Sequence, residues 1–65
     1  MNRGTVIAFK CIKTKIWYTG TIEIYRSNSD FHVKLTMPIE PQWYEKHDKT
    51  HYHSSEIESI KILEP

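Results

Sequence analysis

The chain has 65 residues and a mass of 7.8 kDa, with 38% hydrophobic residues, 12% aromatic residues and a formal net charge of +1. This length excludes a second domain, and the composition excludes both a disordered tail and a Gly- or Pro-rich fibre. A chain this short buries only about 60% of the surface that its unfolded form exposes, so a monomeric enzyme with a deep active site is not expected. We expect residues 1–65 to form one small domain.

The cysteine content and the first residues point to a cellular location. The only cysteine is Cys11, which excludes an internal disulfide and is typical of a reducing compartment. The opening residues carry no apolar run of signal-peptide length, and no segment approaches the roughly 20 apolar residues of a membrane span. We therefore expect a cytoplasmic protein with no membrane partner.

Two strands are predicted in the first part of the chain. Residues 5–11 are β-branched and aromatic, and Ile7, Phe9 and Cys11 share one face. A polar turn at 12–15 leads to a second strand at 16–26. Its alternation predicts an inner face formed by Ile16, Tyr18, Gly20, Ile22 and Ile24. The other face, which we expect to contact water, is formed by Trp17, Thr19, Thr21, Glu23 and Tyr25.

A hairpin and a long loop follow. The turn-forming residues 27–30 connect the second strand to a third at 31–36, whose Phe31, Val33 and Leu35 point inward while His32, Lys34 and Thr36 face water. Residues 37–49 contain two prolines and many charges, which favours a long irregular loop.

The chain closes with a short strand, a turn and a last strand. Residues 50–54 alternate, with His51 and His53 on one face and Tyr52 on the other. The spacing Ser55-x-x-Glu58 is that of a capping box, and it predicts a single helical turn before a fifth strand at 59–63.

Five strands with one short helical turn before the last resemble the SH3-like small barrels of the Tudor and KOW type. The segments that carry the resemblance are Gly4-Thr5-Val6-Ile7-Ala8, Trp17-Tyr18-Thr19-Gly20-Thr21-Ile22, Phe31-His32-Val33-Lys34-Leu35 and Ser55-Glu56-Ile57-Glu58-Ser59-Ile60-Lys61-Ile62. Gly20 fits this fold because a small barrel bends its strands sharply. The resemblance implies an all-β, five-stranded SH3-like barrel.

The resemblance also implies a binding function rather than an enzymatic one. Stand-alone chains of this kind are common among phage and mobile-element proteins that act on a host factor, so we expect a non-catalytic regulator or inhibitor that binds a protein. Residues 18–22 are similar to a stretch of the plasmid-borne type II dihydrofolate reductases, but the Val-Gln-Ile-Tyr motif of those enzymes is absent. No catalytic activity is therefore expected.

Aromatic residues outside the inward pattern are the first candidates for the partner-binding site. Exposed Trp and Tyr side chains are typical of interface hot spots. The resemblance points the same way, because Tudor-type modules bind methylated side chains in a cage of aromatic rings. The candidates are Trp17, Tyr25, Trp43, Tyr44 and Tyr52. The alternative is that Trp43 and Tyr44 cover one end of the core.

The charge distribution supports an alternative function in nucleic-acid binding. Residues 1–36 contain six basic and two acidic residues, whereas residues 37–65 contain three basic and six acidic ones. A basic strip interleaved with Trp17 and Tyr25 would suit single-stranded nucleic acid. The strip would consist of Lys10, Lys13, Lys15, Arg26 and Lys34, and it is interrupted by Glu23 and Asp30.

Three histidines near the fourth strand have a spacing that suits a metal. His47, His51 and His53 form a His-x3-His-x-His pattern, and two of them project from the same side of a strand. The favoured interpretation is nevertheless solvated histidines, because no cysteine lies nearby, and we expect neither a metal nor a cofactor. Exposed strand edges also leave open whether the chain is a monomer or a homodimer.

Overall fold

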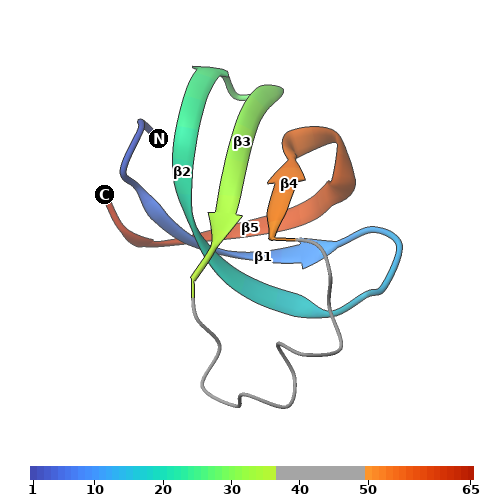
Figure 1. The fold of residues 1–65 in the computed structure, drawn as a ribbon. Helices are drawn as coiled ribbons and strands as arrows, with labels where there is room; N and C mark the ends of the chain where they lie inside the picture. Colours follow the sequence, from blue (N-terminus) through green and yellow to red (C-terminus); the bar gives the residue numbers. More distant parts are fainter. Residues whose placement is uncertain (37–49) are drawn as a thin grey trace.

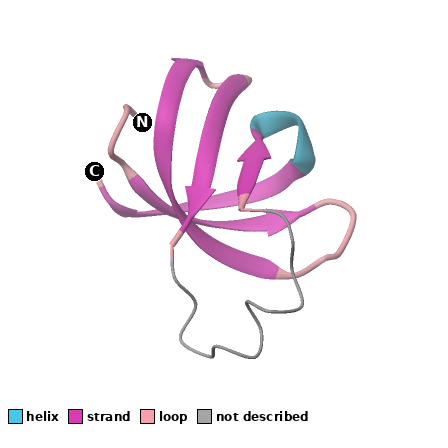
Figure 2. Cartoon of the chain, in the orientation of Figure 1, coloured by secondary structure: helices cyan, strands magenta, loops and turns pink. Residues whose placement is uncertain are grey.

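A computed structural model describes residues 1–36 and 50–65, and the long loop predicted at 37–49 lies outside the described residues. The strands are β1 (Val6–Cys11), β2 (Trp17–Ser27), β3 (Asp30–Leu35), β4 (His51–His53) and β5 (Ile57–Glu64), with a 3-10 turn at Ser54–Glu56 (Figures 1 and 2). All neighbouring strands are antiparallel, in the order β4-β3-β2-β1-β5. Within residues 1–36 and 50–65 the fold is all-β, as predicted. β4 and β5 are the edges of the sheet, which is open.

Strand β2 belongs to two hydrogen-bonded ladders and bends between them (Figure 1). Its first residues pair with β1, its later residues pair with β3, and Gly20 lies opposite Ile7 on one side and Leu35 on the other. A Cβ atom on Gly20 would lie 2.5 Å from Val33 Cγ1 and 2.8 Å from the carbonyl oxygen of Lys34. Glycine is required here because the neighbouring strand approaches too closely for any side chain.

A β-bulge reverses the side-chain alternation in the second half of β2. The register passes from Ile22 opposite Val33 directly to Ile24 opposite His32, which leaves Glu23 as the extra residue. Beyond the bulge Tyr25 lies opposite Phe31 and packs against the core, whereas Ile24 is exposed. The predicted positions of Ile24 inside and Tyr25 outside are therefore wrong.

The core is formed by the inward residues of β1 to β4. Its members are Ile7, Phe9, Cys11, Tyr18, Ile22, Phe31, Val33, Leu35 and Tyr52. This confirms the predicted inner faces of the first and third strands, but Ile16 is exposed and does not belong to the core. The rings of Phe9, Tyr18 and Tyr52 lie with their centroids 5.4 to 5.7 Å apart. Aromatic packing thus joins β1, β2 and β4 in the middle of the molecule.

The predicted turn before the last strand exists, but its capping residues lie two positions earlier than expected. His53 is the N-cap: its side chain accepts a hydrogen bond from the backbone N–H of Ser55, and the Glu56 carboxylate accepts one from the backbone N–H of His53. The predicted pair Ser55 and Glu58 does not form the cap, because Glu58 already belongs to β5. In the described residues no helix is long or apolar enough to cross a membrane.

We expect Gly20→Ala to lower the free energy of unfolding by about 1–3 kcal/mol, because the new methyl group must displace β3. Urea denaturation followed by fluorescence measures this loss. Thr19→Ala is the matched control, since Thr19 is an exposed neighbour in the same strand and its loss costs less than about 1 kcal/mol. Equal stability of the Gly20→Ala variant and the wild type would contradict the close approach of β3.

Candidate functional site

The aromatic residues predicted to bind a partner lie in different environments. Trp17 is 51% exposed, Tyr25 is half-buried against Phe31, and Tyr52 is 5% exposed and belongs to the core. Trp43 and Tyr44 lie outside the described residues. Among the described candidates, only Trp17 therefore has the exposure that a partner-binding aromatic requires.

Three large apolar residues in or next to the turn between β1 and β2 are exposed. Ile12, Ile16 and Trp17 are 46%, 41% and 51% exposed, and we call these three residues the turn surface. The turn is held by hydrogen bonds from the backbone N–H of Cys11 to the carbonyl of Ile16, at 3.0 Å, and from the N–H of Lys15 to the carbonyl of Cys11, at 2.9 Å. The turn surface is thus presented by a hydrogen-bonded backbone.

A further hydrogen bond attaches this turn to the 3-10 turn. The backbone N–H of Ile12 donates to the carbonyl of Glu56, in the 3-10 turn, at 2.9 Å. The Thr14 hydroxyl also lies 3.1 Å from the hydroxyl of the buried Tyr18. The β1–β2 turn is anchored to both the 3-10 turn and the core. Little conformational entropy would therefore be lost when a partner binds there.

Three of the five basic residues proposed for nucleic acid lie close to acidic side chains. Lys10 Nζ lies 3.4 Å from Glu58 Oε1, and Lys15 Nζ lies 2.5 Å from Glu58 Oε2. The hydrogen bond from Lys15 and, to a lesser degree, the positive charges of Lys15 and Lys10 hold the pKa of the Glu58 carboxyl below its usual value. At the other end of β2, Arg26 Nη1 lies 3.7 Å from Asp30 Oδ1. Acidic partners therefore offset the charge of at least three of these five residues.

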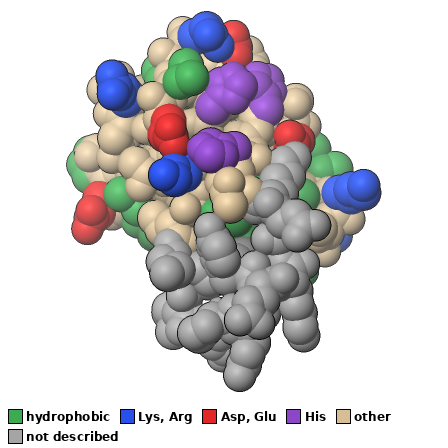
Figure 3. Space-filling view, in the orientation of Figure 1, with side chains coloured by type: hydrophobic (Ala, Val, Ile, Leu, Met, Phe, Trp, Pro, Cys, Tyr) green, Lys and Arg blue, Asp and Glu red, His purple; other side chains and the backbone are tan. Residues whose placement is uncertain are grey.

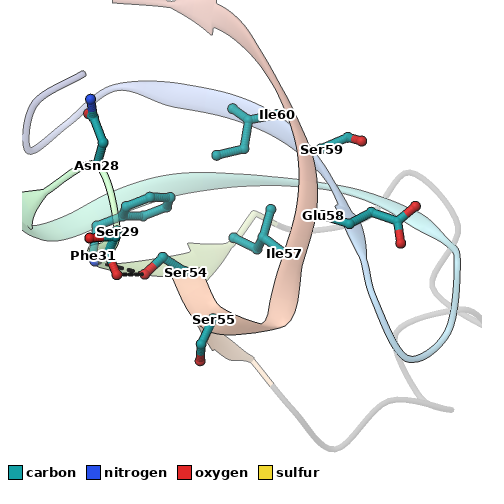
Figure 4. A pocket seen from close by; sticks show the side chains of 9 residues that line it. All are labelled: Asn28, Ser29, Phe31, Ser54, Ser55, Ile57, Glu58, Ser59 and Ile60. Carbon is teal, nitrogen blue, oxygen red and sulfur yellow. Dashed lines mark hydrogen bonds between the residues drawn. The ribbon is translucent and has the colours of Figure 1, made fainter.

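An open pocket of about 380 Å³ lies between the β2–β3 hairpin and β5 (Figure 4). Phe31 lines it from β3, and Ile57 and Ile60 line it from β5. Ser54 closes one side: its hydroxyl donates to the carbonyl of Ser29 at 2.8 Å and accepts from the backbone N–H of Phe31 at 3.3 Å. The pocket is thus partly apolar, and its position marks the place where the open sheet leaves a gap.

Histidines gather on the outer face of β3 and β4 (Figure 3). His53 Nε2 lies 3.1 Å from Asp30 Oδ1, and the His32 ring meets the His53 ring edge-on with centroids 4.8 Å apart. His51 instead faces Glu23, with Nε2 3.3 Å from Oε1. The structure therefore gives His51 and His53 different acidic partners, although the sequence places the two residues in one candidate set.

The residues that do join His53 were missed by the sequence pattern. Asp30 and His32 belong to β3, and His32 lies opposite His53 in the antiparallel register of β3 and β4. Their ligand atoms and that of His53 all lie within 4.8 Å of one another, and we call these three residues the histidine cluster. The sequence signal for this cluster was the outward-facing position of His32. That position indicates a contact with His53 only when the pairing register of β3 and β4 is known. His47 lies outside the described residues.

Asp30, His53 and Ser55 form a chain of contacts that superficially resembles a hydrolase triad. The Ser55 hydroxyl lies 2.9 Å from His53 Nδ1, and Asp30 lies at the other ring nitrogen. However, Nδ1 already accepts a hydrogen bond from the backbone N–H of Ser55, at 3.1 Å. The single lone pair of that nitrogen is therefore occupied, whereas a triad needs it to take the hydroxyl proton.

Two buried groups, Tyr52 and Cys11, have shifted pKa values. Burial raises the pKa of Tyr52, and its hydrogen bond with Tyr18 acts in the same direction. Burial also opposes ionisation of the Cys11 thiol, but hydrogen bonds from Thr14 and Lys13 outweigh it and lower the pKa of this thiol. Cys11 is only 4% exposed, which is consistent with its predicted role as a core residue.

No family model, no curated protein and no solved structure matches this chain. Its function is therefore inferred from the geometry of its own residues.

We expect Tyr52→Ala and Trp17→Ala to differ strongly in their effect on stability. Loss of the buried Tyr52 ring leaves a cavity beside Phe9 and Tyr18 and costs about 3–5 kcal/mol, whereas loss of the exposed Trp17 ring costs less than about 1 kcal/mol. Urea denaturation compares the two variants, and Tyr52→Phe serves as the volume-conserving control. A Trp17→Ala variant as unstable as Tyr52→Ala would show that Trp17 is a core residue.

Proposed function

We propose that this chain is a non-catalytic binding module that docks on a protein partner through its turn surface, Ile12, Ile16 and Trp17. The observation that carries the proposal is the exposure of Trp17, 51%, at the start of β2 and next to a turn whose backbone is hydrogen-bonded to the rest of the fold. A large aromatic side chain that is exposed to solvent on an ordered backbone is typical of an interface hot spot.

The composition of the turn surface favours a protein partner. Ile12 and Ile16 add exposed apolar area in the adjoining turn, and Lys13 lies in this turn as an exposed cation. An apolar centre with a charged rim is typical of protein interfaces. The partner that fits best therefore presents an apolar pocket edged by acidic residues.

The fold proposal is an SH3-like barrel of the Tudor or KOW type. The order of elements supports it, because five strands with a single 3-10 turn before the last are the arrangement on which the resemblance rests. In this proposal the gap lined by Phe31, Ile57 and Ile60 is the place where the barrel would close. A small cytoplasmic regulator that acts on a host factor, encoded by a phage or mobile element, is the role that this fold suggests.

Nucleic-acid binding is the alternative, and the ion pairs argue against it. Counterion release requires several cations to converge on phosphates, but Lys10 and Lys15 converge on Glu58. A phosphate could form ion pairs with these two lysines only by displacing the Glu58 carboxylate. If nucleic acid is nevertheless the ligand, Glu58→Gln would strengthen binding and added salt would weaken it steeply.

The proposal is tested by capture of partners from a nuclease-treated lysate of the source cells, using tagged wild type, Trp17→Ala and Leu63→Ala. We expect one defined protein to be retained by the wild type and lost with Trp17→Ala, because loss of a hot-spot aromatic costs about 2 kcal/mol, or about thirtyfold in affinity. Titration of the purified partner then measures this ratio.

Leu63→Ala is the matched control, because Leu63 is 47% exposed but lies on β5, away from the β1–β2 turn. It should retain the partner as the wild type does. Equal loss with both variants would contradict the placement of the site at the turn. Recovery of nucleic acid alone, removed by nuclease or by salt, would contradict a protein partner.

A further inference from the structure

We propose that the histidine cluster, Asp30, His32 and His53, binds a divalent first-row transition metal ion of the Zn²⁺ class. This site is separate from the turn surface and does not depend on the proposed function. Its three side chains come from two strands, since Asp30 and His32 belong to β3 and His53 ends β4.

The distances between ligand atoms already approach those around a bound ion. Nitrogen and oxygen ligands at roughly 2.0–2.2 Å from a tetrahedral ion lie about 3.3–3.6 Å from one another. His53 Nε2 and Asp30 Oδ1 are 3.1 Å apart, and all three ligand atoms lie within 4.8 Å. To complete the site, the His32 side chain must move toward the other two ligands. Because its ligand atom already lies within 4.8 Å of theirs, a small rotation of this half-buried side chain suffices.

The backbone holds two of the ligands in place before any ion arrives. His32 and His53 are directly opposite each other in the β3–β4 register, so their side chains emerge on the same face. Their rings are in edge-on contact at 4.8 Å between centroids. A pair of imidazoles fixed by strand pairing is a preorganised half of a metal site.

The second ring nitrogen of His53 has a partner for the metal-bound state. Without an ion, Nδ1 accepts from the Ser55 N–H, so the proton of the neutral ring lies on Nε2 and is donated to Asp30. Coordination through Nε2 moves this proton to Nδ1, where the Ser55 hydroxyl, 2.9 Å away, accepts it. The Ser55 N–H then loses its acceptor, so ion binding changes the cap of the 3-10 turn.

The donor set selects the class of ion. Two imidazole nitrogens and one carboxylate suit Zn²⁺, Ni²⁺ or Cu²⁺, whereas Mg²⁺ and Ca²⁺ prefer oxygen ligands throughout. Three protein ligands leave at least one position for water or for a ligand from another molecule. Arg26, 3.7 Å from Asp30 Oδ1, competes with the ion for this carboxylate, but its side chain is 61% exposed and free to swing into solvent.

The test is a titration of the untagged protein with ZnCl2 and, separately, with MgCl2, by calorimetry and by ¹H–¹⁵N NMR. We expect one Zn²⁺ per chain, no binding of Mg²⁺, and NMR shifts concentrated at Asp30, His32, His53 and the backbone N–H of Ser55. The movement of the Ser55 amide is the specific signature of the proton transfer within the His53 ring.

Variants decide which residues hold the ion. His32→Ala should weaken Zn²⁺ binding by at least about tenfold, and Ser55→Ala by a similar factor, since it removes the partner of Nδ1. His51→Ala is the matched control: it removes a histidine from the same face that lies against Glu23, and it should change the affinity less than about twofold.

Three outcomes would overturn the proposal. One is equal weakening by His32→Ala and His51→Ala, which would show that Zn²⁺ binds surface histidines without preference. The second is loss of binding with His47→Ala but not with His32→Ala, which would assign the ion to His47, His51 and His53. The third is equal binding of Mg²⁺, which would exclude the imidazole ligands. Thermal unfolding of each variant establishes that it is folded before it is titrated.

Discussion

The bend of β2 at Gly20 is the constraint on which the rest of the structure depends. This one strand carries both ladders, with β1 on its first half and β3 on its second, and they overlap at Gly20 and Thr21. The chain can turn there because no side chain separates β2 from Val33 and Lys34. In the described residues, 1–36 and 50–65, no layer of helices covers the sheet, so the sheet must fold over itself to enclose a core.

The sequence predicted the elements well and the details of their faces less well. Alternation identified the core positions of β1 and β3 because neither strand contains an internal irregularity. It failed at Ile24 and Tyr25 because the bulge at Glu23 depends on pairing with β3, which no local pattern records. The histidine cluster was missed for the same reason, since His32 and His53 are 21 positions apart and meet only through the register.

The thin core also explains the unusual exposure of β5. Ile60 and Ile62 lie opposite Phe9 and Ile7, so they emerge on the core side of the sheet, yet they are 38% and 52% exposed. The partners they would need belong to the β2–β3 hairpin, and the pocket lined by Phe31, Ile57 and Ile60 marks the space between. Among the described residues, the core of β1 to β4 therefore leaves the edge strand β5 only partly covered.

The 3-10 turn connects the two proposed sites physically. It carries the His53 cap at its start, and its Glu56 carbonyl accepts the N–H of Ile12, a member of the turn surface. Its Ser54 hydroxyl also bonds to Ser29 and to Phe31. An ion at the histidine cluster would link β3 to β4 but remove the capping bond from the Ser55 N–H to His53. The same 3-10 turn anchors Ile12 of the turn surface, so we expect binding at the two sites to be energetically coupled through the loss of this bond, even without a change of fold.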